Sequence, residues 1–208
     1  MERYSIKNRE FLDVNDVETE KGKSYGFTQE WFKDDYQVLA GCGATVASTI
    51  LTYYEQCKNF KKLEIVDVLP KMEELWKYLP PIKGKGLNST KLFYDGILKY
   101  FKDRNIDIKY SYIDIDIKNK ISLEEIISYL KNEISNNRPV AFLNLCNGEE
   151  NILDKWHWVT VYELFKDNFE GKEEYFLKIL DDREIKKINL SLWYRTIKND
   201  GGFVSFYF

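Results

Sequence analysis

The amino-acid sequence predicts an α+β fold, in which an N-terminal helical part packs on a C-terminal, mostly antiparallel sheet. Two observations support this prediction. Before Pro139 apolar residues recur mostly at helical spacing, whereas after Pro139 they alternate with polar residues or form short apolar runs, as β-strands do. A run of helices followed by a run of strands is typical of α+β domains, because the two kinds of element then pack as separate layers.

Helical spacing is clearest in four segments. A helix is expected to begin at Cys42, because the apolar residues that follow fall on one helical face: Val46, Ala47, Ile50, Leu51 and Tyr54. The same periodicity predicts three further helices, over residues 68–80, 89–105 and 122–137. The last of these has a start signal, since Ser122 and Glu125 can form a capping box. The segment 80–89, which holds prolines and glycines, is expected to be a loop between two halves of one domain.

Strands are expected at residues 106–117, 139–145, 156–165, 174–180 and 201–208. In the third of these, His157, Val159 and Val161 share one face because side chains alternate along a strand. Residues 166–172 contain a glycine and are expected to be the loop of a hairpin between the third and fourth strands. Residues 189–197 are expected to form a short helix or a turn.

Composition and charge limit the class of protein. The chain has 208 residues, which fits a single domain spanning 1–208, and its 44% hydrophobic and 16% aromatic residues can fill a core. The 31 basic and 34 acidic residues nearly cancel, to a formal net charge of -3. This balance argues against electrostatic binding of nucleic acid or of an anionic membrane surface.

The sequence also predicts a compartment. Its first 18 residues are rich in charge and lack the apolar core of a signal peptide, and its apolar runs are too short to span a bilayer. Three widely separated cysteines cannot all pair with one another. Reduced thiols in the cytoplasm are therefore expected, and no membrane partner is.

Cys42 is the first candidate for chemistry. It lies between Gly41 and Gly43, two residues that allow a sharp turn into the helix and leave the thiol uncrowded. The N–H groups and dipole at a helix N-terminus favour an anion, and the thiolate is the nucleophilic form of cysteine. The alternative interpretation is that Cys42 is a small packing residue at a tight turn.

His157 is the one histidine of the chain, so a conventional base for Cys42 must be this residue. Such a base needs a partner for its second ring nitrogen. The next predicted strand ends at Asp181 and Asp182, which a hairpin would bring close to the start of the histidine strand. Asp181 lies on the same face of its strand as the apolar residues Leu177 and Ile179, because alternate side chains point to the same side. It is therefore the expected partner, and Asp182 is the alternative.

The order cysteine, histidine, aspartate then resembles a known family. The segment GCGATVASTILTYY (41–54) resembles the nucleophile helix of papain-like cysteine peptidases, especially the bacterial C39-like group, which processes bacteriocins. The segment HWVTVYEL (157–164) resembles its histidine strand, and FLKILDDREIKKINLSLWY (176–194) its aspartate strand and the turn that follows. The resemblance runs from Gln29 to Trp193. It implies a papain-like cysteine proteinase fold, with the nucleophile helix packed on the sheet that carries histidine and aspartate.

The resemblance also implies a glutamine that lines the oxyanion hole just before the cysteine. Gln37 lies five positions before Cys42, about one fewer than in the family pattern, and Gln29 is the alternative. Ala44 is a second departure, because the family often has proline there. Proline is favoured at the start of a helix but is not required.

The implied activity is hydrolysis of a peptide or amide bond through a thioester, with Cys42, His157, Asp181 and Gln37 at the site. The expected partner is a peptide or a small acyl or amide substrate. Two alternatives use the same fold: a thiol acyltransferase of the transglutaminase kind, and a binding module without activity. The exporter-linked role of many C39 peptidases is not expected, because the sequence has no membrane-spanning or ATP-binding segment.

No cofactor or metal is expected. A zinc site would have to use residues that lack the spacing of paired ligands: Cys42, Cys57, Cys146 and His157. The acidic residues Asp114 and Asp116 alternate with isoleucines, which favours the solvent face of a strand over a metal site. The oligomeric state stays open.

Overall fold

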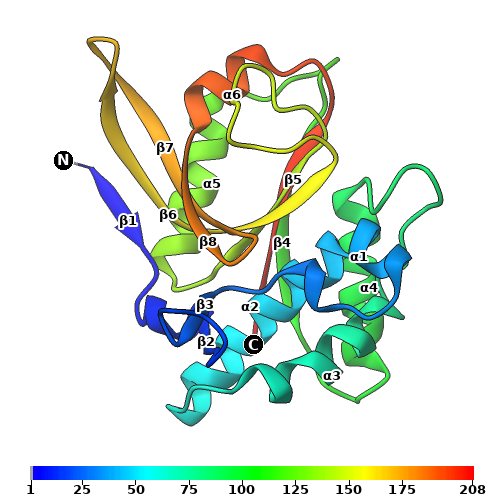
Figure 1. Ribbon diagram of the computed structural model, residues 1–208. Helices are drawn as coiled ribbons and strands as arrows, with labels where there is room; N and C mark the ends of the chain where they lie inside the picture. The colour runs from blue at the N-terminus through cyan, green and yellow to red at the C-terminus, as the bar shows by residue number, and fades with distance from the viewer. Residues whose placement is uncertain (1) are drawn as a thin grey trace.

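The computed structural model describes residues 2–208 (Figure 1). Within these residues one seven-stranded sheet has the order β4-β9-β5-β6-β7-β8, with β1 paired to β6, and its pairings are antiparallel. The strands of this sheet are β1 (Arg3–Ser5), β4 (Lys109–Ile115), β5 (Val140–Asn144), β6 (His157–Phe169), β7 (Lys172–Asp181), β8 (Glu184–Asn189) and β9 (Gly201–Tyr207). A small second sheet pairs β2 (Asp13–Asn15) with β3 (Lys23–Tyr25).

Six α-helices accompany the sheet in the described part of the chain. They are α1 (Asp35–Ala40), α2 (Cys42–Asn59), α3 (Ile65–Trp76), α4 (Thr90–Lys102), α5 (Leu123–Ser135) and α6 (Leu190–Thr196). Two short 3₁₀ helices, η1 (Arg9–Leu12) and η2 (Gln29–Trp31), lie in the N-terminal segment. The α+β prediction is therefore confirmed, as is the capping box of Ser122 and Glu125 at the start of α5.

Two apolar clusters lie on opposite faces of the sheet, as the alternation along β5 shows. Ala141 and Leu143 pack in one cluster with residues of α2, α3 and α4. Val140 and Phe142 pack in the other with residues of α5 and α6. Figure 1 shows the same division, with α2 and α3 below the sheet, α4 to its right, and α5 and α6 beside its upper part. The helix α2 thus packs on the sheet through the first cluster.

The sequence misplaced several boundaries. Residues 166–172 are not a loop: β6 and β7 stay paired to Phe169 and Lys172, and the turn consists of Glu170 and Gly171, both with positive φ. This ribbon projects from the body of the protein in Figure 1, so both of its faces meet solvent and the apolar alternation is lost. The strand β8 and the helix α1 were not predicted, since β8 is a largely polar strand at the sheet edge and α1 has only six residues.

No helix within residues 2–208 combines the length and the apolar character that crossing a bilayer requires.

Candidate active site

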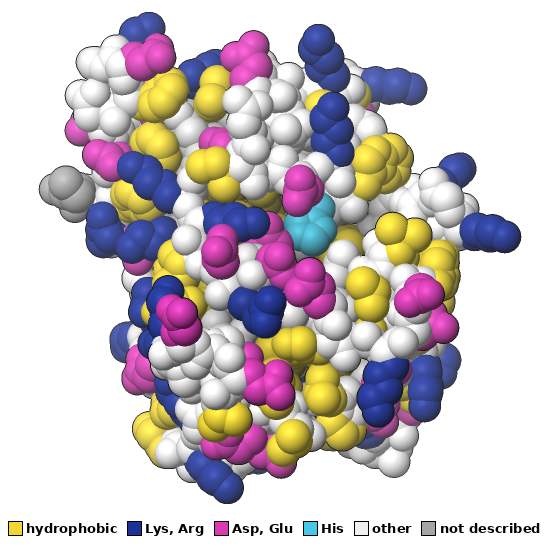
Figure 2. All heavy atoms as spheres, viewed as in Figure 1, with side chains coloured by type: hydrophobic (Ala, Val, Ile, Leu, Met, Phe, Trp, Pro, Cys, Tyr) yellow, Lys and Arg dark blue, Asp and Glu magenta, His cyan; other side chains and the backbone are white. Residues whose placement is uncertain are grey.

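A cleft of about 160 Å³ lies where the first half of α2 meets the start of β6 and the end of β7. Cys42, His157 and Asp181 all line it, together with Gln29 of η2 and Lys186 of β8. Figure 2 shows the single histidine, in cyan, at the surface with acidic side chains next to it. Segments that are far apart in the sequence thus meet at one site, and three of the four predicted site residues are among them.

Cys42 is the first residue of α2 and is buried, with 8% of the residue exposed. The first helical bond joins the Thr45 N–H to the Gly41 carbonyl, so the N–H groups before Thr45 have no partner within the helix. The residue before the helix, Gly41, supplies no side chain to cap it. Donors and the positive end of the helix dipole are therefore available beside the sulfur, as the sequence predicted.

The glycines around Cys42 have a different purpose from the one expected. Gly41 has φ -84°, which any residue can adopt, so no unusual turn is needed there. A Cβ on Gly41 would lie 2.4 Å from the Gln37 carbonyl oxygen and 2.5 Å from the Phe32 ring. A Cβ on Gly43 would lie 2.5 Å from Leu87. Close packing against the Gln37 backbone, rather than backbone freedom, requires the glycine at position 41, whereas at Gly43 the Leu87 side chain could move aside.

His157 and Asp181 form a direct hydrogen bond, with 2.7 Å between His157 Nε2 and Asp181 Oδ1. The register of the β6–β7 hairpin explains it. Thr160 pairs with Leu180, which places Asp181 one residue beyond the last pair and on the same face as His157. Because Nε2 is engaged, Nδ1 is the ring nitrogen left to face Cys42.

Asp182 lies in a different environment. Asp182 and Arg183 both have positive φ and form the two-residue turn between β7 and β8. The Asp182 carboxylate accepts a hydrogen bond of 2.6 Å from the Thr28 hydroxyl. The structure therefore brings Asp181, and not Asp182, to the histidine.

The electrostatics of the cleft favour a charged imidazole. Burial disfavours the imidazolium of His157, but its contacts with Asp181 and Cys42 outweigh burial and raise the pKa of His157 to about 10. Burial likewise opposes ionisation of Asp181, yet His157 and Lys186 lower the pKa of that carboxyl below its ordinary value. Since a shifted pKa at a cleft marks a functional site more often than chance would, these shifts support the placement of the site.

Lys186 is the site residue that sequence reasoning missed. Its Nζ donates to Asp181 Oδ2 across 2.8 Å, so the two carboxylate oxygens are shared between a lysine and a histidine. The signal was present in the sequence. In a two-residue hairpin, a lysine five positions after an aspartate returns to the same end of the sheet, but β8 itself was not expected.

The two glutamines occupy different environments. Gln37 is buried outside the cleft, and its Nε2 donates to Glu73 Oε2 across 2.8 Å, which ties α1 to α3. The placement expected for Gln37 beside Cys42 is therefore not observed. Gln29 lines the cleft, and its Oε1 is buried with no hydrogen-bond partner in the described residues. A carboxamide can turn either its oxygen or its NH₂ group toward a ligand, so Gln29 can act as a donor there.

The other thiols lie outside the cleft. Burial raises the pKa of Cys57, which outweighs its contacts with Tyr53 and Asn8. All three cysteines are free thiols. In residues 2–208 no group of three or more histidine, cysteine or acidic side chains is arranged to hold a metal ion.

The fold was compared with known proteins. No protein-family model matches the sequence, and no curated protein sequence matches it either. Among solved structures, the crystal structure of UfSP from C. elegans matches with a TM-score of 0.54 at 12% sequence identity. UfSP is a cysteine protease of papain-like fold. The match covers 99% of this chain.

The chain has a papain-like fold. The prediction of this fold is thus confirmed. The chain spans 34% of the UfSP chain, and at this identity the likeness concerns the papain-like fold alone. Within that fold, the helix that begins at Cys42 and the strand that begins at His157 meet at the cleft described above.

Proposed function

We propose that this protein is a cysteine hydrolase of the C39-like group, which cleaves a peptide or amide bond through a thioester. One observation carries the proposal: His157 is hydrogen-bonded to a buried aspartate and faces a cysteine at a helix N-terminus, within one cleft. This arrangement holds a nucleophile, a base and an orienting group in reach of one another. Packing of the core alone would not require a half-buried imidazole, a buried carboxylate and a thiol at the same surface opening.

The first half of the reaction acylates Cys42. The Cys42 thiolate attacks the substrate carbonyl carbon, a C–S bond forms, and the carbonyl π electrons move onto oxygen. The N–H of Cys42 and the side-chain amide of Gln29 would stabilise this oxyanion. When the oxyanion collapses, the C–N bond breaks, and the imidazolium of His157 gives its proton to the departing amine.

The second half releases the acyl group. His157, now neutral, takes a proton from water, which attacks the thioester carbonyl. The C–S bond breaks, the carboxylic acid leaves, and the thiolate and imidazolium are restored. Asp181 holds the ring in place and stabilises its charged form throughout. Lys186 keeps the Asp181 carboxylate ionised.

A fluorogenic peptide library tests this proposal. The wild-type protein is expected to cleave at least one member of the library, and Cys42→Ser is expected to cleave none. Cys57→Ala serves as the matched control, because it removes a thiol outside the cleft and should keep full activity. Intact-mass measurement of a quenched reaction should show the substrate acyl group on Cys42.

The same experiment separates the alternatives that share the fold. An acyltransferase would form product only when an amine acceptor such as hydroxylamine or lysine is supplied. A binding module would bind peptides with no adduct on Cys42. Adduct formation with release of a carboxylic acid in water alone would establish the hydrolase.

A further inference from the structure

A second cavity lies at the other end of α2 from Cys42. It has a volume of about 610 Å³ and is bounded by α2, α3 and α4. The cleft uses residues of the first half of α2, up to Thr49, whereas this cavity uses residues of the second half, from Leu51 to Asn59. The two cavities have no lining residue in common, so the second, here called the helical cavity, is a separate site.

The floor of the helical cavity is apolar and held in place. Leu51 and Phe101 are buried in the cluster that packs against the sheet. The Phe208 ring packs edge-on against Phe101 and Tyr54, with centroids 5.4 and 5.6 Å away. At the mouth, Ile106 is 44% exposed and Phe208 is 64% exposed. Apolar side chains therefore extend from the interior to the surface, which is unfavourable in water unless a ligand covers them.

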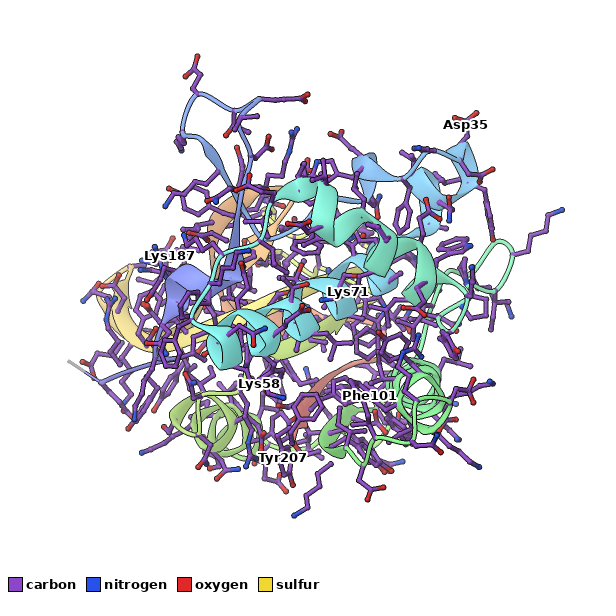
Figure 3. The ribbon with its side chains drawn as sticks, turned by 90° about the horizontal axis from the view of Figure 1, so that it is seen from below. Asp35, Lys58, Lys71, Phe101, Lys187 and Tyr207 are labelled. Atoms are coloured by element: carbon purple, nitrogen blue, oxygen red, sulfur yellow. The ribbon has the colours of Figure 1, made fainter. Side chains whose placement is uncertain are left out.

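The rim of the helical cavity carries an excess of positive charge. Three cations and one carboxylate line it: Lys58, Lys71, Arg104 and Glu55. Figure 3 looks onto this face and shows Lys58, Lys71 and Phe101 around it, from three different helices. Lys71 pairs with Glu55, and Arg104 pairs with Glu74 outside the cavity, so Lys58 adds a further positive charge at the mouth.

Two of these cations are fixed rather than free in solvent. The Lys71 side chain is only 18% exposed, and its Nζ also donates to the Thr52 hydroxyl across 3.3 Å. The Arg104 guanidinium lies 3.6 Å above the Tyr100 ring. A positive rim above an apolar floor is the arrangement that an amphipathic anion requires, with the headgroup on the cations and the tail on the floor.

We infer that the helical cavity binds a small amphipathic anion, namely a carboxylate with an extended aliphatic tail. Its volume lies within the range of about 300–1,000 Å³ that small-molecule sites occupy. The positive rim favours an anionic headgroup, for which a carboxylate is the simplest probe, and the apolar floor favours the tail. A ligand that has only the headgroup or only the tail would contact only the rim or only the floor, and should therefore bind more weakly.

Isothermal titration with three probes tests the ligand class. Decanoate, below its micelle-forming concentration, is expected to bind with one-to-one stoichiometry. Decanol has the same tail without charge, and acetate has the charge without the tail, so both are expected to bind at least tenfold more weakly. Equal affinity for decanoate and decanol would overturn the inference, as would no decanoate binding at millimolar concentration. Decanoate has no amide bond, so this result is independent of the proposed hydrolase activity.

Matched variants test the location. Lys58→Glu is expected to weaken decanoate binding about fivefold, while Lys61→Glu, the same exposed change outside the cavity, should leave it unchanged. Ile106→Ser should weaken decanoate binding about threefold through lost apolar contact, and Leu39→Ser, an exposed residue elsewhere, should not. All four side chains are exposed, so the fold is retained. Equal losses in a variant and its control would place the ligand elsewhere and refute the site.

Discussion

Lys186 Nζ lies 2.8 Å from Asp181 Oδ2, on the side of the carboxylate that His157 does not occupy. The lysine therefore competes with the imidazolium for the same negative charge. It also holds the carboxylate plane, so that Oδ1 points at the ring. Lys186 acts on the imidazole through Asp181 and is therefore a positioning residue.

Lys186→Met is expected to raise the pKa of His157 further, because Asp181 then interacts with the imidazolium alone. The high-pH limb of Cys42 alkylation should move to higher pH, and thermal unfolding should show a loss of about 1–2 kcal/mol from the missing charged hydrogen bond. Lys187→Met is the matched control, because the neighbouring lysine pairs with Asp167 on the projecting hairpin. An unchanged pH profile with reduced stability would mean that Lys186 is purely structural.

Alkylation of the three cysteines should separate Cys42 from the others. We expect iodoacetamide to modify Cys42 fastest below pH 7, and His157→Ala to abolish this advantage, because the imidazolium that stabilises the thiolate is lost. Peptide mass spectrometry from pH 4 to 10 reads each site, with Cys57, whose pKa burial raises, as the internal reference. Identical Cys42 rates in wild type and His157→Ala would argue against an ion pair.

The same pKa shifts predict how stability depends on pH. The pKa of His157 is raised to about 10 in the folded state, so its contribution is fully present below the unfolded value of about 6.5 and is lost as pH rises toward 10. The pKa of Asp181 is lowered, so its contribution is present above about 3.9 and is lost as pH falls below that value. The free energy of unfolding, measured with urea, should therefore be highest between about pH 3.9 and about pH 6.5 and should fall on either side. In His157→Ala the decline toward pH 10 should be smaller.

The two aspartates should respond differently to the same substitution. Asp181→Asn is expected to lower kcat by about 10²–10⁴, because the ring loses its orienting carboxylate. Asp182→Asn should lower kcat by less than about threefold and cost at most about 1 kcal/mol of stability through its bond to Thr28. Steady-state kinetics on the best library substrate measures both. If Asp182→Asn were the more damaging change, the assignment of Asp181 would be wrong.

The two glutamines provide a similar test of the oxyanion hole. Gln29→Ala should lower kcat by about 10²–10³ with little change in melting temperature. Gln37→Ala should leave kcat nearly unchanged but destabilise the protein by about 1 kcal/mol, because it removes the bond to Glu73. A loss of kcat in Gln37→Ala without loss of stability would mean that Gln37, and not Gln29, lines the oxyanion hole.

The parts of the fold with regular periodicity could be predicted from the sequence. The start of α2 at Cys42 and the capping box of α5 follow from local patterns and were found where expected. The polar strand β8 could not be predicted, because it has no regular apolar face. Its lysines instead make contacts with residues distant in sequence or across a turn, Lys186 with Asp181 and Lys187 with Asp167 of the projecting hairpin. Lys186 was missed for the same reason.

The site itself was predicted in part. The juxtaposition of His157 and Asp181 follows from strand parity and hairpin geometry, both of which are local. The choice between Gln29 and Gln37 is not local. It depends on how η2 and α1 fold back over the start of α2, and Gln37 is drawn to Glu73 on α3, thirty-six positions away. Spacing from the cysteine does not determine such a path.

The position of β9 has a consequence for synthesis on the ribosome. This strand follows every proposed site residue in sequence, yet it lies between β4 and β5 within the sheet. A nascent chain that has not yet released residues 201–207 leaves β5 with an open edge, so the layer on which α2 and the hairpin rest is incomplete. We therefore expect the pairing of Cys42 with His157 to form only after β9 has joined the sheet.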